Sequence, residues 1–265
     1  MENYIKILFK EKDEEQRGIL IAELSDEGYS FEESEDLAAY IEEGKFDDAK
    51  LCALIGDRQF EKSVIENTNW NEQWESEFQP VTIKSVRVRA AFHEKNGAKH
   101  DIIITPKMSF GTAHHPTTAL MISEMLEMDL KKKSVLDFGT GTGVLAILAE
   151  RLGAEKVIAI DNDEWSITNA KENLVSNKTK KVQLLQKDHV EGLGEFDLIL
   201  ANINLNVILY NLLPLKNCGK SGSKILLSGF LASDVNNIER ATRQGFIVEK
   251  VAKLDDWAAV LLSLP

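Results

Sequence analysis

The spacing of apolar positions becomes regular after Pro106, where short apolar runs alternate with segments whose apolar residues recur every three or four positions. The short runs predict strands and the recurring pattern predicts helices. Strands are expected near 134–137, 156–161, 182–187, 196–201, 223–228, 246–254 and 258–264, with helices near 117–128, 144–152, 165–176, 204–213 and 234–244. This alternation predicts a doubly wound, mostly parallel sheet. The last two strands are too close for a crossover helix, so we expect them to be antiparallel.

The first 105 residues show a more mixed pattern. Strands at 4–9 and 36–42, with helices at 17–27 and 46–55, predict a small α+β domain. Residues 59–77 are polar and compatible with a helix, and Trp70 and Trp74 lie on one face of it. We therefore predict three parts, with boundaries at 1–60 for the small domain, 61–79 for a linker helix and 80–265 for the catalytic domain.

A short β-rich region opens the third part of the chain. Residues 81–92 and 101–105 have strand character, and Lys95-Asn96-Gly97 between them is typical of a hairpin turn. We expect these two segments to pair as antiparallel neighbours.

Charge is distributed unevenly. The chain carries −12, yet residues 1–60 alone hold 17 Asp and Glu against 7 Lys and Arg, which leaves −2 for the other 205 residues. An acidic field attracts basic proteins and repels phosphate backbones, so we expect no direct nucleic-acid partner. The alternative is a solvated face that keeps the domain soluble.

The chain also lacks several signals of other protein classes. It has no apolar run of membrane-spanning length and no secretory signal at its start, and two cysteines provide neither a disulfide framework nor metal-ligand spacing. We expect a cytoplasmic protein with no membrane association.

A glycine-rich turn follows the predicted strand at 134–137. Asp137 precedes Gly139, Gly141 and Gly143, and an amphipathic helix begins directly after them. The next predicted strand ends at Asp161. In a βαβ unit these two strand ends are neighbours, so a ribose could bridge the glycine turn and the Asp161 carboxylate. The alternative is a glycine-rich turn without a ligand.

The turn indicates which cofactor it would bind. A dinucleotide fingerprint requires glycine at the sixth position, where Val144 stands, and no Gly-Lys-Ser/Thr follows as in a P-loop. Asp137 would repel a pyrophosphate but suits a ligand with an ammonium and a sulfonium. S-adenosylmethionine is such a ligand, and seven strands with an antiparallel terminal pair are the arrangement of methyltransferases that use it.

Two further segments are expected at the same pocket. Asn202 follows the strand at 196–201, where its amide oxygen could accept a hydrogen bond from an amine and orient the nitrogen for methyl transfer. The alternative role is a helix cap, which suits Asn204 better. The other segment, residues 110–118, contains His114 and His115. These histidines lack the Cys or carboxylate spacing of a metal site, so we expect no metal.

Residues 110–118 resemble the Phe-Gly-Thr-Gly-x-His-x-Thr-Thr segment of the ribosomal protein L11 methyltransferases. Further similarities, in the same order as in that family, are Trp70, Trp74 and Pro80, the turn at 137–143, Ala201-Asn202-Ile203 and Asp256-Trp257. The resemblance spans residues 65–265, whereas the first 60 residues match only in size and pattern. One departure is Ala113, where the family often has glycine. Alanine, unlike glycine, disfavours positive φ.

The resemblance implies a Rossmann-like methyltransferase sheet with a small ferredoxin-like substrate-recognition domain. It implies that Thr118, Gly139, Asp161 and Asn202 contact S-adenosylmethionine, together with Asp137 and Gly141 of the turn, and that Phe110 and Thr112 line the methyl-donor side. It further implies a monomeric protein N-methyltransferase that modifies the N-terminal α-amine and lysine ε-amines of ribosomal protein L11, a basic protein.

Two other functions stay open. One is a methyltransferase of another protein or of a small-molecule amine, and the other is an S-adenosylmethionine-binding protein that has lost catalysis.

Overall fold

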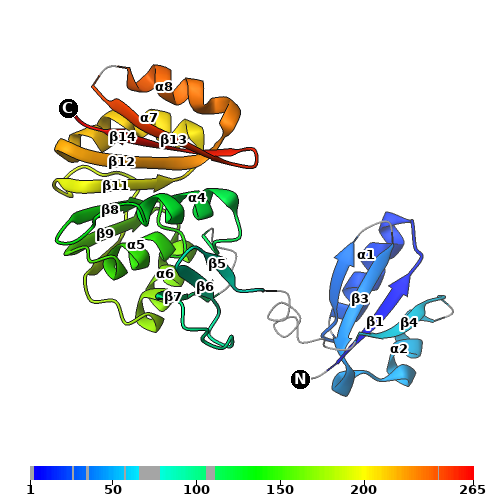
Figure 1. Cartoon of the computed structure of the whole chain (residues 1–265). Helices are drawn as coiled ribbons and strands as arrows, with labels where there is room; N and C mark the ends of the chain where they lie inside the picture. Colours follow the sequence, from blue (N-terminus) through cyan, green and yellow to red (C-terminus); the bar gives the residue numbers. More distant parts are fainter. Residues whose placement is uncertain are drawn as a thin grey trace. The chain divides into compact units, whose positions relative to one another are not determined.

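The structure is a computed structural model that describes residues 3–25, 27–33, 36–56, 58–65, 78–105, 111–243 and 245–265. The chain forms two compact units, Met1–Glu77 and Phe78–Pro265 (Figure 1). No helix in these described ranges combines the length and the apolar character that crossing a bilayer requires.

In its described residues, the first unit is a four-stranded antiparallel sheet with two α-helices. Its elements are β1 (Tyr4–Phe9), α1 (Glu14–Ser25), β2 (Ser30–Glu33), β3 (Leu37–Glu42), η1 (Glu43–Lys45), α2 (Asp48–Ile55) and β4 (Glu61–Ile65). The strand order β2-β3-β1-β4 and the βαββαβ sequence of elements are those of a ferredoxin-like fold. Its core is formed by apolar side chains of the strands and helices, including Ile7, Phe9, Leu20, Leu24, Leu37, Leu51 and Ile55.

The boundary of this unit differs from the predicted one. Residues 61–65, assigned above to the linker helix, form β4 and pair with β1, from Tyr4 opposite Ile65 to Leu8 opposite Glu61. The edge of β1 that does not pair with β3 offers backbone N–H and C=O groups for hydrogen bonding. A polar segment can pair with this edge even when its local sequence is compatible with a helix. The remainder of the predicted linker, including Trp70 and Trp74, lies outside the described residues.

The second unit is organised around a seven-stranded sheet of order β10-β9-β8-β11-β12-β14-β13. Its strands are β8 (Ser134–Phe138), β9 (Lys156–Asp161), β10 (Val182–Gln186), β11 (Phe196–Asn202), β12 (Gly219–Leu231), β13 (Ile247–Leu254) and β14 (Trp257–Ser263). The first five in the spatial order are parallel, and β14 is antiparallel to both of its neighbours. The predicted doubly wound sheet and the antiparallel last pair are confirmed.

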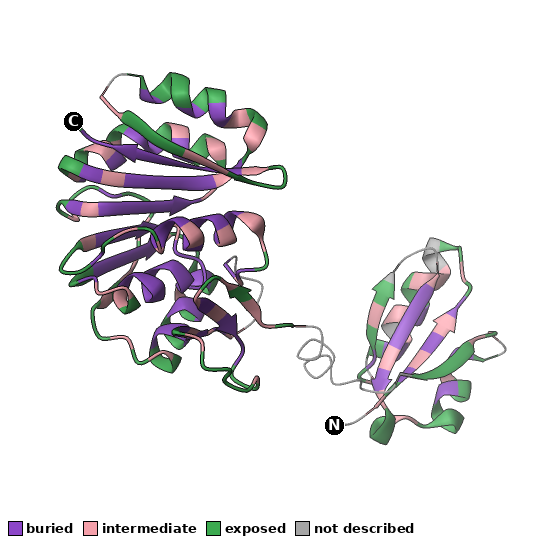
Figure 2. Ribbon diagram, in the orientation of Figure 1, coloured by how far each residue is buried: buried purple, intermediate pink, exposed green. Residues whose placement is uncertain are grey.

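Helices cover both faces of this sheet (Figure 1). They are α4 (Pro116–Met125), α5 (Val144–Arg151), α6 (Glu164–Ser176), α7 (Leu205–Asn217) and α8 (Val235–Thr242), with the short η2 (Ala232–Asp234) before α8. Alternate strand residues enter two cores: Val135 packs with α4 and α5, whereas Leu136 packs with α7 and α8. The central strands are therefore buried along most of their length (Figure 2).

A small sheet of β5 (Val81–Ile83), β6 (Val86–Arg89) and β7 (His100–Ile103) precedes the large one. The predicted hairpin at 95–97 is wrong, because β6 and β7 are parallel. The tight turn instead lies between β5 and β6, where Lys84 adopts a φ of 51°.

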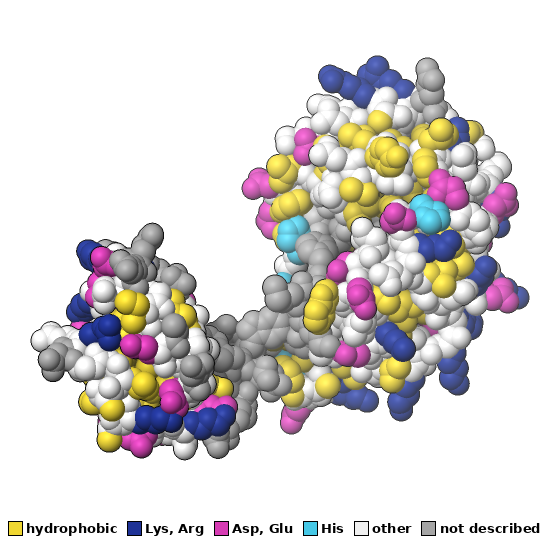
Figure 3. Space-filling model, turned by 180° about the vertical axis from the view of Figure 1, so that it is seen from behind, with side chains coloured by type: hydrophobic (Ala, Val, Ile, Leu, Met, Phe, Trp, Pro, Cys, Tyr) yellow, Lys and Arg dark blue, Asp and Glu magenta, His cyan; other side chains and the backbone are white. Residues whose placement is uncertain are grey.

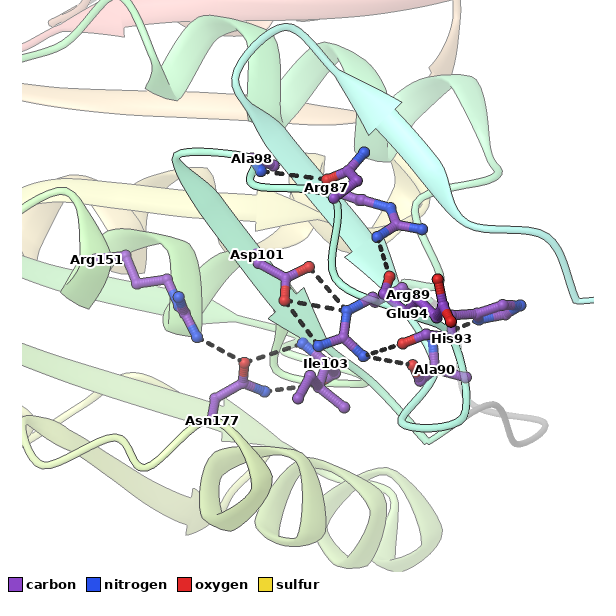
Figure 4. Close-up of polar contacts among 11 residues, drawn as sticks. Arg87, Arg89, Ala90, His93, Glu94, Ala98, Asp101, Ile103, Arg151 and Asn177 are labelled. Atoms are coloured by element: carbon purple, nitrogen blue, oxygen red, sulfur yellow. Dashed lines mark hydrogen bonds and ion pairs between the residues drawn. The ribbon is translucent and has the colours of Figure 1, made fainter.

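The guanidinium of Arg89 holds β6, β7 and the loop between them together. It is buried, pairs with Asp101 at 2.8 Å, and donates to the carbonyl oxygens of Ala90 at 3.0 Å and His93 at 2.8 Å (Figure 4). A buried cation requires such full pairing. The loop is therefore fixed by a side chain that the turn pattern did not take into account.

Candidate active site

A cavity of about 510 Å³ lies at the carboxyl ends of the parallel strands. This is the edge where open α/β sheets bind their ligands. It is lined by His115, Phe138, Gly139, Gly141, Asp161, Asn162, Ser166, Lys187, Asp188, Asn202, Ile203, Asn204, Val207, Gly229 and Trp257. Four residues expected at the site, Gly139, Gly141, Asp161 and Asn202, are among them.

The glycine turn is bonded to the end of β9. The amides of Gly139 and Thr140 both donate to the carbonyl oxygen of Ile160 over 2.9 Å, and the Gly141 amide donates to Asp161 Oδ2 over 2.8 Å. Gly139 has a φ of 76°, and a Cβ there would overlap the side chain of Ile203. Glycine is therefore required at this position by its φ and by its close neighbour.

Asp137 lies buried beneath the turn and does not line the cavity. Its Oδ2 accepts a hydrogen bond from the Thr140 hydroxyl over 2.6 Å, and its Oδ1 is buried without a hydrogen-bond partner among the described residues. Burial raises the pKa of Asp137 to about 6, and the nearby Asp161 carboxylate adds to the rise. The hydrogen bond from Thr140 opposes it by stabilising the carboxylate. The group is poised to be stabilised by a nearby cation.

Asn202 ends β11 and is held by α4. Its side-chain nitrogen donates to Thr118 Oγ1 over 3.3 Å, and both side chains are buried. Its Oδ1 has no hydrogen-bond partner within the described part of the chain. Asn204 caps α7 through a bond from the Val207 amide, as expected, so Asn202 is left available for a ligand.

His115 and Trp257 are cavity residues to which sequence reasoning gave no role in the pocket. His115 Nδ1 accepts from the Thr117 amide as the cap of α4. The His115 ring meets the Trp257 ring edge-on at 4.5 Å, and burial lowers the pKa of His115. The contact joins residues 142 positions apart, which no local pattern reveals.

The segment before α4 contacts the glycine turn from the other side. Thr142 donates from its hydroxyl to the carbonyl oxygen of Gly111 over 2.8 Å. Ala113 has a φ of 67°, a region that alanine disfavours, but its methyl group is buried in the core, which offsets the strain. Thr112 does not line the cavity, and Phe110 lies outside the described residues.

Asn169 and Asn173 of α6 and Asn177 at its C-cap bond the backbone of residues 103–105, and Asn173 also bonds the glycine turn. Asn173 donates to the carbonyl oxygen of Thr142 over 2.9 Å and accepts from the Thr105 amide over 2.7 Å. Asn169 donates to the Thr105 carbonyl, and Asn177 bonds both backbone groups of Ile103. Side-chain amides thus satisfy the backbone groups of Ile103 and Thr105.

No cluster of three or more possible metal ligands occurs among the described residues, His114 and His115 included. His114 instead bonds the carbonyl oxygen of Gln79 and the hydroxyl of Thr112. The site therefore combines a glycine turn, buried carboxyl and amide oxygens, and an aromatic wall.

The chain matches a known protein family over nearly its whole length. The family model described as ribosomal protein L11 methyltransferase (PrmA) matches residues 5–264. A ribosomal protein L11 methyltransferase of Phocaeicola vulgatus is 40% identical over 245 residues, which are 87% of each chain. That of Chlorobaculum parvum is 36% identical over 280 residues, covering 98% of this chain and 96% of the relative.

Solved structures agree with these sequence matches. The crystal structure of a ribosomal protein L11 methylase from Lactobacillus delbrueckii subsp. bulgaricus superposes with a TM-score of 0.65 at 26% identity, covering 71% of this chain and 99% of that one. A precorrin-6y C5,15-methyltransferase from Geobacter metallireducens shares the fold, with a TM-score of 0.52 at 15% identity, covering 60% of this chain and 92% of that one.

Proposed function

The chain belongs to the ribosomal protein L11 methyltransferase family, and on this premise we propose that it methylates amines of ribosomal protein L11, using S-adenosylmethionine. The acceptors are the N-terminal α-amine and lysine ε-amines. The observation that carries the proposal is the buried, unbonded Oδ1 of Asn202 in the wall of the cavity, held in place by Thr118.

The residues of the cavity fit the cofactor. S-adenosylmethionine supplies a methyl group on a sulfonium, which is reactive toward a neutral amine. Asp161 would hold the ribose, because a carboxylate accepts hydrogen bonds from its two hydroxyls, and the glycine turn lets the ligand approach the backbone closely. The buried Asp137, unbonded at Oδ1, gives the donor's ammonium and sulfonium a nearby negative charge. Gly139, Gly141 and Asn202 would complete the donor site, with Thr118 holding the Asn202 side chain.

Asn202 would orient the acceptor nitrogen. Its Oδ1 accepts a hydrogen bond from the amine and directs the lone pair toward the methyl group, so catalysis rests on positioning. A lysine near pKa 10.4 is neutral at pH 7 only at a cost of about 4.6 kcal/mol, against about 1 to 1.4 kcal/mol for an α-amine. The α-amine is therefore the easier acceptor, and each lysine must lose its proton on entering the pocket.

The first unit would recognise the substrate. Residues 1–60 carry 17 acidic and 7 basic side chains, and ribosomal proteins that bind RNA are basic. We place the enzyme in the cytoplasm, where ribosomal proteins are made, and expect it to act as a monomer.

One experiment separates the candidate functions. The enzyme is incubated with radiolabelled S-adenosylmethionine and a mixture of purified ribosomal proteins, ribosomal RNA and small amines. Label in ribosomal protein L11 alone supports the proposal. Label in another protein, in RNA or in a small amine identifies a different acceptor, and bound cofactor without transfer indicates lost catalysis. Mass spectrometry of labelled L11 then locates the modified amines.

A further inference from the structure

Helix α7 presents an unusual outer face. Its inner positions, Ile208, Asn211, Leu212 and Leu215, are buried against the sheet. Its exposed outer positions are Asn206, Val207, Tyr210, Leu213 and Asn217, none of them charged, although 28% of the whole chain is charged. A surface helix normally places its charged residues on this side.

Three of these outer residues are large and apolar. The exposed fraction is 38% for Val207, 85% for Tyr210 and 65% for Leu213. They recur at every third position, so they form one row inclined to the helix axis, which we name the α7 stripe. Hydrophobic side chains gather over this part of the second unit in Figure 3. Exposed apolar rows of this kind mark interaction sites more often than isolated residues do.

The α7 stripe begins at the cavity. Val207 lines the cavity and is also the first member of the stripe, and Asn204, which caps α7, lines it as well. Leu213 lies six residues further on, or about 9 Å along the helix axis. A polypeptide whose amine enters the cavity would continue over this surface for about three extended residues.

We propose that the α7 stripe binds an apolar segment of the methyl-accepting protein, next to the amine that enters the cavity. This inference rests on the proposed function, since it assumes a protein acceptor. Tyrosine and leucine suit an apolar side chain rather than the basic surface that the acidic first unit attracts. The next residue of the row, Lys216, is half-buried, with its amine 5.6 Å from the centroid of the Phe246 ring. The stripe therefore selects by shape and apolar contact the amines that lie beside such a segment.

The test compares two surface variants. The double variant Tyr210→Ser, Leu213→Ser removes the stripe but leaves Val207 in the cavity. Val175→Ser on α6 is the matched control, because Val175 is 72% exposed on a different helix and does not line the cavity. The steady-state KM and kcat for recombinant ribosomal protein L11 are measured for each, with the Kd for S-adenosylhomocysteine by calorimetry.

The double variant should raise KM for the protein about tenfold, as loss of a buried tyrosine anchor typically does, with kcat and the cofactor Kd unchanged. Val175→Ser should leave all three unchanged. An unaltered KM in the double variant, or an equal rise in the control, overturns the proposal. So does a wild-type dimer that becomes monomeric in the double variant, because the stripe would then bind a second copy. Wild-type enzyme that binds cofactor but never labels L11 refutes the proposed function itself.

Discussion

Thr118 on α4 and Asn202 at the end of β11 are joined across the candidate active site, with 3.3 Å between the asparagine nitrogen and the threonine hydroxyl oxygen. Since the nitrogen is engaged, the amide presents its oxygen as the free group. An asparagine side chain is nearly symmetric in shape, so its two ends are distinguished by their hydrogen bonds. With its nitrogen bonded to Thr118, Asn202 has its oxygen available for an amine.

Replacing this asparagine should reduce turnover. We expect Asn202→Ala to lower kcat about tenfold or more, with a modest rise in the cofactor Kd, because it removes a group that orients the acceptor. Thr118→Val should lower kcat less, since the amide remains but loses its fixed orientation. Single-turnover methyl transfer checks both. Wild-type rates in Asn202→Ala would remove this residue from the mechanism.

Asn173 should support cofactor binding through the glycine turn, because it bonds the carbonyl oxygen of Thr142. We expect Asn173→Ala to raise the Kd for S-adenosylhomocysteine about tenfold, consistent with leaving a buried carbonyl unsatisfied. Asn177→Ala is the control, since it loses bonds to Ile103 but none to the turn. If the two variants lowered Tm equally and also raised the Kd equally, Asn173 would act only through the stability of the fold.

The buried Asp137 should make stability depend on pH. Its pKa is raised from 3.8 to about 6, so the folded state holds the proton longer than the unfolded state, and stability falls as pH rises through this window. The free energy of unfolding falls by about 3 kcal/mol, and the fall is complete above the pKa of Asp137 in the folded state. Asp137→Asn should abolish this component. Urea unfolding of the cofactor-free protein at pH 4 and pH 7 measures it, and parallel pH profiles for both proteins would contradict it.

Three glycines should differ in their tolerance of alanine. Gly192 has a φ of 79° and open space around it, so Gly192→Ala should cost only the backbone strain, about 1 kcal/mol. In Gly139→Ala the new methyl would overlap the Ile203 side chain, and in Gly229→Ala it would overlap the Ile203 backbone. We expect the cost to increase in this order, to more than about 3 kcal/mol for Gly229→Ala. Thermal unfolding tests the ranking, and equal Tm values would refute it.

The acidic first unit should contribute to substrate affinity. Glu32→Lys combined with Asp36→Lys should raise KM for ribosomal protein L11 and leave the Kd for the cofactor unchanged. Because Glu32 also accepts a hydrogen bond from the Tyr40 hydroxyl, Glu32→Gln serves as the control that can keep this contact without the charge. The rise in KM should weaken at high salt. Unchanged affinity at low salt would mean that these charges only maintain solubility.

Local sequence patterns determined the main elements of this protein. The period of apolar residues located all seven strands of the large sheet and its five helices, because each depends on which face of a short segment is buried. The parallel order then placed Gly139, Gly141, Asp161 and Asn202 at one edge without further information. The antiparallel last pair followed from the length of one connection.

Only the tertiary structure decided which distant residues meet. The strand at 61–65, the parallel pairing of β6 with β7 and the contact of His115 with Trp257 all depend on partners remote in sequence. The same holds for Asn173 beneath the turn. Periodicity reports whether a side chain is buried, but its partner is set by how the elements pack, which local spacing does not contain.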